Sequence, residues 1–311
     1  MKAIVYQKYG SPDVLELQEV EKPTVTDGEV LVRVHAASVN PLDWHFLRGK
    51  PFVVRIFAGL VRPKRKILGA DVAGRVEAVG GKVTQFQPGD EIFGNRFGAF
   101  AEYLCVPERG VVLKPANLTY EEAAAVPVAA LTALQGLRDK GQIQPGHKVL
   151  INGASGGVGT FAVQIAKSFG AEVTGVCSTR NLDMVRSIGA DRVIDYSEED
   201  FTQTGGRYDL ILDAVGNHSL SDCKRALHAN GIYVAVAGSL VRALWIAMTG
   251  RKRMVGMLTK SNREDMGFLK ELLETGKVTP VIDRRYPLSE VAEALRYLEE
   301  GHAQGKVVIT V

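Results

Sequence analysis

The sequence of 311 residues contains only three cysteines, Cys105, Cys177 and Cys223, which are far apart and form no C-x-x-C pair. This scarcity excludes a disulfide framework and a four-cysteine zinc lobe, and it fits a reducing cytoplasm. The first residues carry no secretory signal pattern, and no stretch of about 18 uncharged apolar residues predicts a transmembrane helix. We therefore expect a cytoplasmic globular protein.

Motifs for metal-dependent and nucleophilic catalysis are also lacking. There is no H-E-x-x-H, no cluster of His, Cys and carboxylate residues, and no G-x-S-x-G turn around a nucleophilic serine. We expect no metal site and no serine-hydrolase chemistry.

The predicted secondary structure changes along the chain. Up to about residue 118, short alternating strands such as 29–37 and 71–79 are separated by Gly and Pro turns, which indicates a partly open β-barrel-like domain. From residue 147, strands and helices alternate with the lengths of an α/β protein, which predicts a Rossmann-type, doubly wound parallel sheet. The predicted domains are 1–119 with 264–311, and 120–263.

The strongest single motif is the stretch 149–160, VLINGASGGVGT, in which an apolar strand leads into a glycine-rich turn and a helix. Such a turn presents a helix N-terminus to a dinucleotide pyrophosphate. Ala154, Gly156 and Gly159 match the pattern A-x-G-x-x-G. Gly156 would let the backbone approach the phosphates, and Gly159 would let the helix lie close to the strand.

The next strand, 171–177, predicts which nucleotide is bound. An NAD site places an acidic residue near the end of this strand, whereas this chain has Ser178, Thr179 and Arg180 there. Ser178 and Arg180 can donate hydrogen bonds to a 2′-phosphate, so the pattern favours NADP(H). Arg180 as an ordinary surface residue is the alternative.

Other predicted strands end in small or polar residues at the same edge of the sheet. We expect the nicotinamide to lie against Val215, Gly216 and Gly238, where small residues let backbone groups face a flat ring. Tyr196 could cover the 2′-phosphate end, and half-buried packing is the alternative for it.

A second polar cluster, 38–45, follows the predicted strand 29–37 at Pro41. The Asn40 amide could donate to a substrate carbonyl, and Asp43 could anchor a ribose hydroxyl or a water. His45 could move protons, although a packed or surface role is the more common one for a lone histidine beside a tryptophan.

Two stretches are both apolar and basic: 50–66 has six basic residues and no acid, and 240–260 has five and no acid. They could line a cleft whose positive field attracts a phosphate-rich cofactor, which we favour, or form a surface for membranes or anionic ligands. Interleaved aromatic residues of the kind that stack on single strands are lacking, so no nucleic acid is expected.

From end to end the sequence resembles the zinc-independent quinone oxidoreductase (zeta-crystallin-like) branch of the medium-chain dehydrogenase/reductase superfamily. Zinc-binding members have a cysteine near Asn40 and Gly-His-Glu at Gly69-Ala70-Asp71. The resemblance is carried by 38–44, 69–74, 88–90, 124–137, 153–159, 189–191 with 195–196, and 305–308.

The resemblance implies a GroES-like catalytic domain beside the Rossmann domain, with NADPH-dependent hydride transfer to a small hydrophobic quinone or an α,β-unsaturated carbonyl. It implies a homodimer. It also implies that Asn40 and Asp43 lie near the substrate and that Thr132 lies near the nicotinamide. The full set of predicted cofactor-binding residues is Thr132, Ser155, Gly156, Gly157, Val158, Ser178, Arg180, Tyr196, Val215, Gly216 and Gly238.

Three alternatives stay open at this point. The apolar, basic segment 51–66 favours a larger or more hydrophobic acceptor over small polar quinones. A 2-enoyl thioester reductase is the other enzyme considered. A cofactor-binding protein without turnover, associated with RNA or with a membrane surface, is the alternative outside enzymes, and weak membrane-surface contact is compatible with either.

Overall fold

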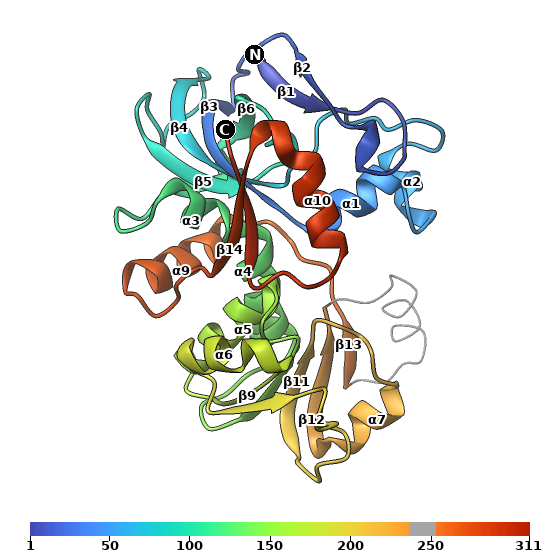
Figure 1. The fold of residues 1–311 in the computed structure, drawn as a ribbon. Helices are drawn as coiled ribbons and strands as arrows, with labels where there is room; N and C mark the ends of the chain where they lie inside the picture. The colour runs from blue at the N-terminus through green and yellow to red at the C-terminus, as the bar shows by residue number, and fades with distance from the viewer. Residues whose placement is uncertain (237–252) are drawn as a thin grey trace. The chain divides into compact units, whose positions relative to one another are not determined.

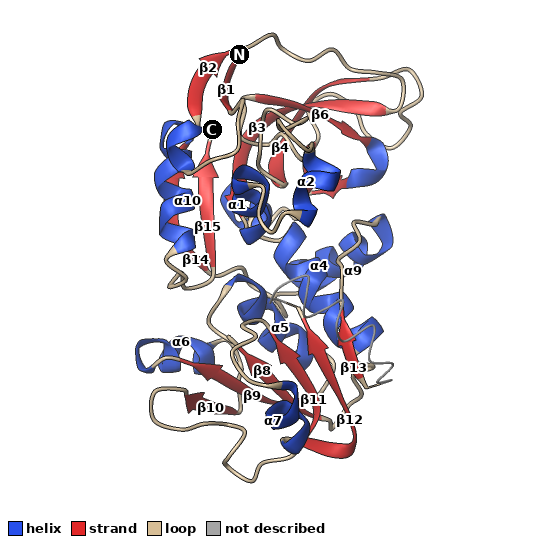
Figure 2. Ribbon diagram, turned by 90° about the vertical axis from the view of Figure 1, so that its right-hand side faces the viewer, coloured by secondary structure: helices blue, strands red, loops and turns tan. Residues whose placement is uncertain are grey.

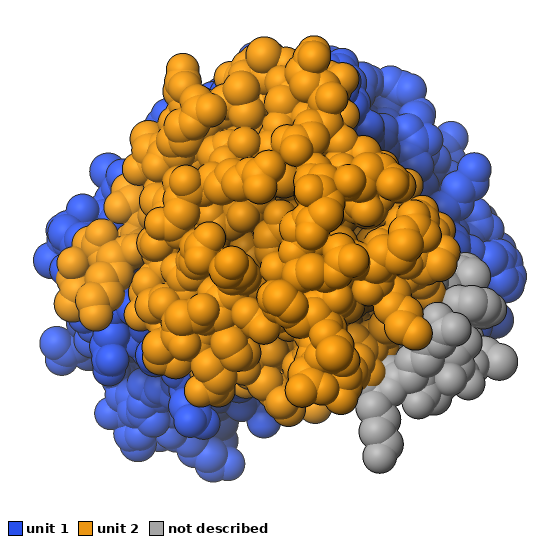
Figure 3. All heavy atoms as spheres, turned by 90° about the horizontal axis from the view of Figure 1, so that it is seen from below, with its two compact units in different colours: residues 1–128, 261–274, 280–311 blue, residues 129–260, 275–279 orange. Residues whose placement is uncertain are grey.

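The computed structural model describes residues 1–236 and 253–311, and these form two compact units (Figures 1 and 3). Unit 1 contains Met1–Val128, Ser261–Glu274 and Pro280–Val311, and unit 2 contains Ala129–Lys260 with Thr275–Thr279. Each unit has its own sheet. Among the described residues, no helix has the length and apolar character needed to cross a bilayer.

Unit 2 is built on a six-stranded sheet in the order β10-β9-β8-β11-β12-β13, and all of its strand pairs are parallel. The chain begins in the middle, moves outward on one side, and then crosses to the other side, so the order reverses between β8 and β11. This confirms the doubly wound parallel sheet predicted from the alternating pattern. The strands are β8 (Lys148–Asn152), β9 (Glu172–Cys177), β10 (Arg192–Asp195), β11 (Tyr208–Asp213), β12 (Leu227–Ala235) and β13 (Met254–Gly256).

The helix α5 (Gly157–Ser168) has every residue from Gly159 to Ala166 buried. It packs on β8 and β9, as Figure 2 shows. The other helices are α4 (Pro127–Gln135), followed by a π-helical turn at Gly136–Lys140, and the short α6 (Leu182–Ser187) and α7 (Leu220–Arg225). The π-helical turn follows α4 directly, and its hydrogen bonds from residue i to i+5 make it wider than an α-helical turn.

Unit 1 contains a largely antiparallel sheet in the order β14-β15-β3-β4-β5-β7, with β6 added on β3 and a separate β1–β2 pair. The outer strands β14 and β7 do not pair with each other, so the described sheet is open, as predicted. β15 lies between β14 and β3, one strand in from the edge of the sheet. The strands are β1 (Lys2–Val5), β2 (Glu16–Glu19), β3 (Glu29–Val39), β4 (Asp71–Val79), β5 (Glu91–Asn95), β6 (Tyr103–Pro107), β7 (Val111–Leu113), β14 (Ile282–Pro287) and β15 (Lys306–Thr310).

The helices of unit 1 differ most from the sequence-based prediction. The helix α3 (Tyr120–Ala124) begins at a Thr119–Glu122 capping box and packs on β3 and β4. Unit 1 continues to Val128, whereas the predicted boundary is residue 119. Two helices were not predicted, α1 (Pro41–Arg48) and α2 (Val53–Ala58). The remaining helices are α9 (Arg263–Glu274) and α10 (Val291–Glu299).

Candidate functional site

The turn after β8 is shaped by two glycines. Gly153 has a φ of +84°, a left-handed conformation that side chains disfavour. A Cβ at Gly159 would lie 2.0 Å from the Gly153 carbonyl oxygen, so only glycine lets α5 begin this close to the turn. Gly156 precedes the helix in an extended conformation, with no side chain capping the first turn. The backbone N–H groups at the start of α5 are therefore available to an anion.

A buried asparagine connects this turn to the end of β9. Asn181 is 4% exposed, and its amide nitrogen donates to Ser155 Oγ at 2.9 Å and to Ser178 Oγ at 3.2 Å. Because each serine oxygen accepts from Asn181, each hydroxyl hydrogen can be donated elsewhere. Asn181 Oδ1 is buried without a hydrogen-bond partner and so offers an acceptor.

This donor set fits a phosphorylated nucleotide. Two serine hydroxyls free to donate lie beside a helix N-terminus, and an unpaired acceptor lies among them, which matches the phosphate oxygens and hydroxyl groups of a dinucleotide. Ser155 and Ser178, two of the residues predicted from the sequence, are thus brought together by a third, Asn181, that was not predicted to bind.

Other predicted residues follow the neighbouring strands at the same edge. Cys177 of β9 pairs with Asp195 of β10, so the exposed Arg180 and Tyr196 come from adjacent strand ends. Tyr196 is 57% exposed, and its role at the 2′-phosphate end stays a prediction. A Cβ at Gly153 would lie 2.7 Å from Val215 Cγ2, so the loop after β11 lies against the glycine turn.

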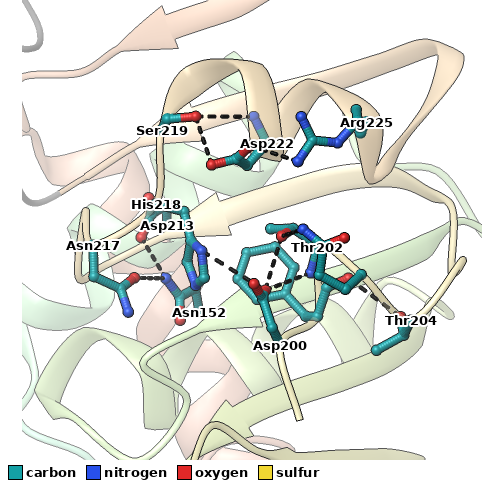
Figure 4. Close-up of polar contacts among 12 residues, drawn as sticks. Asn152, Asp200, Thr202, Thr204, Asp213, Asn217, His218, Ser219, Asp222 and Arg225 are labelled. Atoms are coloured by element: carbon teal, nitrogen blue, oxygen red, sulfur yellow. Dashed lines mark hydrogen bonds and ion pairs between the residues drawn. The ribbon is translucent and has the colours of Figure 1, made fainter.

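A carboxylate at the end of β11 shapes that loop (Figure 4). Asp213 is buried and accepts hydrogen bonds from the backbone N–H groups of Val215 and Gly216 at 3.0 and 2.8 Å. The Asn152 amide donates to Asp213 Oδ1 and to Asn217 Oδ1, and Tyr233 donates to Asp213 Oδ2 at 2.5 Å. Val215 and Gly216 are therefore held by a buried polar network and not by their own side chains.

Of the predicted cofactor residues Thr132 and Gly238, the structure describes only the first. Thr132 lies on α4, where its hydroxyl shares a 2.7 Å hydrogen bond with Thr259 of the same unit. Gly238 lies outside the described residues, as does most of the basic stretch 240–260.

Unit 1 contains a fully buried group of charged and polar side chains centred on Asp71, which is 0% exposed. Asp71 Oδ2 accepts from Ser38 Oγ at 2.7 Å and from the Asn40 amide at 2.9 Å, and Asp71 Oδ1 accepts from the Val128 backbone at 2.9 Å. A buried carboxylate requires such compensation, because desolvation of a charge is costly.

The compensating charge is Lys306, from the first position of β15. Its side chain is 3% exposed, and its Nζ lies 2.6 Å from Asn40 Oδ1 and 3.6 Å from Asp71 Oδ2. Burial lowers the pKa of Lys306, whereas Asp71 and Asp43 oppose that shift. The Asn40 amide therefore links the two charged groups, because its oxygen accepts from Lys306 and its nitrogen donates to Asp71.

Asp43 lies beside this group and accepts hydrogen bonds from two backbone N–H groups. Its Oδ2 accepts from the Asn40 backbone N–H at 2.8 Å, which caps α1, and its Oδ1 accepts from the Gly69 backbone N–H at 3.0 Å. Burial raises the pKa of Asp43 to about 7, an effect that the two backbone hydrogen bonds oppose and the Asp71 charge reinforces.

These contacts bear on the roles predicted for Asn40 and Asp43. The Asn40 amide nitrogen is shared between Asp71 and the Ser38 carbonyl oxygen, at 2.9 and 3.4 Å. Donation to a substrate carbonyl stays a prediction, and it requires that one of these hydrogen bonds be given up. His45 Nδ1 donates to the Lys50 carbonyl oxygen at 2.8 Å, in keeping with the packed role.

The sequence reasoning missed Asn181, Ser38, Asp71 and Lys306 as site residues. The signal for Lys306 was present: a lone lysine begins an otherwise apolar final strand. No corresponding signal exists for Asn181, because asparagine is common in the first turn of helices. Among residues 1–236 and 253–311, no group of three or more His, Cys, Asp or Glu side chains is arranged to hold a metal ion.

Taken together, the strand order, the glycine turn and the hydroxyl donors at the carboxyl ends of β8 and β9 define a dinucleotide-binding oxidoreductase domain. Residues 26–116 match the family described as alcohol dehydrogenase GroES-like domain, and residues 188–309 match the family described as zinc-binding dehydrogenase.

Individual relatives extend this likeness over the whole chain. A 2-methylene-furan-3-one reductase of Solanum lycopersicum is 38% identical over 99% of this chain and 79% of its own length. An NADPH-dependent alkenal/one oxidoreductase of Arabidopsis thaliana is 36% identical with the same coverage. The solved quinone oxidoreductase of Coxiella burnetii has a TM-score of 0.90 and 33% identity, covering 100% of this chain and 99% of its own. The chain belongs to the medium-chain dehydrogenase/reductase superfamily, in the group of quinone oxidoreductases and alkenal reductases.

Proposed function

We propose that this protein transfers hydride from NADPH to an α,β-unsaturated carbonyl compound or a quinone. The observation that carries the proposal is the Ser155–Asn181–Ser178 cluster, which leaves two serine hydroxyls able to donate, with Ser178 at the end of β9 where an NAD site would have a carboxylate. The relatives named as NADPH-dependent alkenal/one oxidoreductase and quinone oxidoreductase support the choice of acceptor.

When bound, NADPH supplies the hydride, and the protein supplies position and electrostatics. The N–H groups at the start of α5 and the hydroxyls of Ser155 and Ser178 bind phosphate oxygens, and Arg180 adds a positive charge. Val215 and Gly216, fixed by Asp213, form a small-residue wall for the nicotinamide. Holding the two reactants in fixed geometry is worth several orders of magnitude in rate.

We also propose that no zinc takes part. A conjugated enone or quinone delocalises the developing negative charge, so its reduction depends less on a Lewis acid than the oxidation of an alcohol does. A chelator should therefore leave turnover unchanged. We also propose the cytoplasmic location and the homodimer that the sequence analysis expects.

The purified protein should oxidise NADPH when given an enone or a quinone, measured as loss of nicotinamide absorbance. A substrate panel of quinones, enones, enoyl thioesters and aldehydes, run with NADPH and NADH in parallel, covers the alternatives. Failure to turn over any enone or quinone would contradict the proposal.

A second candidate is supported by one solved structure. The CurK enoyl reductase is 26% identical over 99% of this chain, with a TM-score of 0.86. Preference for an enoyl thioester in the same panel, by kcat/KM, would favour this candidate over a free enone.

Replacement of Arg180 by alanine should weaken the binding of NADPH much more than the binding of NADH. Loss of one charge-assisted hydrogen bond of about 1.5–3 kcal/mol predicts a fall of roughly 10- to 150-fold in kcat/KM for NADPH. The exposed Arg207 is a matched control, because it precedes β11 and Arg207→Ala therefore removes the same charge at the amino end of a strand, away from this edge. Equal effects of Arg180→Ala on the two nucleotides would show that Arg180 does not bind the 2′-phosphate.

A further inference from the structure

The segment 50–66 of unit 1 exposes an unusual set of side chains. Five large apolar residues are at least half exposed within ten positions, whereas such residues are mostly buried in this protein. Their exposed fractions are Phe52 67%, Ile56 57%, Phe57 76%, Leu60 60% and Val61 84%.

The outward orientation follows from the local structure. The helix α2 has only six residues, and among them only Ala58 is buried. Phe52, Ile56 and Leu60 recur every four residues, and Phe57 and Val61 repeat that spacing one position later. Ile56 and Phe57 are thus exposed on the helix, Phe52 just before it, and Leu60 and Val61 in the loop that follows it.

Contacts within unit 1 hold the segment in this form. Tyr9 donates to the Gly59 carbonyl oxygen at 2.5 Å, and Arg55 donates to the Gly49 carbonyl oxygen at 3.1 Å while lying over the Tyr9 ring. Arg65 lies over the Phe97 ring, 4.4 Å from its centroid. The apolar surface is thus preformed, and two of the six cations serve to anchor it.

The other four cations surround the apolar residues. Lys50, Arg62, Lys64 and Lys66 are exposed, and the segment contains no acidic residue. A protein partner fits this composition less well, because Lys is depleted at protein–protein interfaces. Large apolar side chains flanked by cations of one sign are the composition that enters the interface of a negatively charged bilayer.

We propose that the segment 50–66 docks this protein on the surface of a membrane that contains anionic lipids. Phe52, Ile56, Phe57, Leu60 and Val61 enter the boundary between headgroups and acyl chains, and the four exposed cations contact lipid phosphates. All residues of the proposed docking surface belong to unit 1.

The test is co-sedimentation of the full-length protein with vesicles of phosphatidylcholine alone, or with roughly a quarter of phosphatidylglycerol added. We expect binding to the anionic vesicles only, decreasing as salt is raised. The double variants Phe57→Ser/Val61→Ser and Arg62→Ser/Lys64→Ser should each lower the partition coefficient by about tenfold.

The matched control is Leu17→Ser, which removes an exposed apolar side chain from β2, next to Glu16 and Glu19. It should leave vesicle binding unchanged. Turnover of a short, water-soluble quinone separates this proposal from the proposed function, since docking variants should retain it.

Three outcomes would overturn the docking proposal. Equal binding to both kinds of vesicle, or to neither, would remove the anionic membrane as the partner. A change in self-association of Phe57→Ser/Val61→Ser, seen by sedimentation velocity without any vesicle binding, would assign the surface to a second copy. Loss of turnover with the soluble quinone would assign the segment to the substrate site.

Discussion

Replacement of Lys306 by methionine should lower the unfolding free energy of unit 1 by about 3–5 kcal/mol, the cost of leaving a buried charge without its partner. Methionine keeps the length of the side chain but removes the ammonium group, so Asp71 remains at 0% exposure with no cation beside it. Denaturant unfolding in a Trp245→Phe background measures this, because Trp44 then reports on unit 1 alone.

An exposed ion pair provides the control for that measurement. Lys22 pairs with Glu77 where both side chains are 39% exposed, and such pairs contribute about 0–1 kcal/mol, so Lys22→Met should be nearly neutral. The double variant Lys306→Met/Asp71→Asn should recover part of the loss, since no unpaired charge remains. If Lys306→Met is as mild as Lys22→Met, the buried ion pair does not stabilise the fold.

Unfolding free energy should fall as pH rises from about 4 to 7, with a contribution from Asp43 of up to about 1.4 kcal/mol per pH unit. Burial raises the folded-state pKa of Asp43 from 3.8 to about 7, so in this window the folded protein holds a proton that the unfolded chain has released. The stabilisation from Asp43 is complete at pH values below its pKa in the unfolded chain. It is lost as the pH rises through its pKa in the folded protein.

Unfolding free energies at pH 5 and pH 7 for the wild type and Asp43→Asn isolate this effect, because asparagine does not titrate. The difference between the two proteins removes the contributions of Asp71 and Lys306, which face Asp43 in both. The exposed Asp13, whose pKa is lowered by hydrogen bonds from Ser11 and Arg296, is the control: Asp13→Asn should leave the pH slope unchanged. A slope that survives in Asp43→Asn would show that another group is responsible.

The fold of unit 2 was predictable because its signals are local. Each strand from β8 to β11 is a short apolar run that ends in glycine or polar residues, and the helices between them repeat apolar positions at helical spacing. The nucleotide edge follows from that alternation, since parallel strands bring their carboxyl ends together. The position of Asn181 between two serines depends on side-chain orientation, which no periodicity encodes.

Unit 1 was less predictable for two physical reasons. The first is local: Pro41 ends β3, but it also occupies the first turn of α1, where proline is well tolerated, and Asp43 reaches back to the Asn40 N–H. The sequence Asn40-x-x-Asp43 forms the same kind of capping box as Thr119-x-x-Glu122 at the start of α3. The second is distance along the chain: Lys306 meets Asn40 across 266 residues, and no local pattern reports such a pairing.

The insertion of β15 between β14 and β3 also dictates when unit 1 can be completed during translation. The ribosome delivers all of unit 2 before it delivers Lys306, so the Rossmann sheet can form while the strands β3 to β7 still await their neighbour. Until then Asp71 has no cation. Unit 2 can therefore fold before unit 1 is complete, because the sheet of unit 1 needs the last strand to emerge.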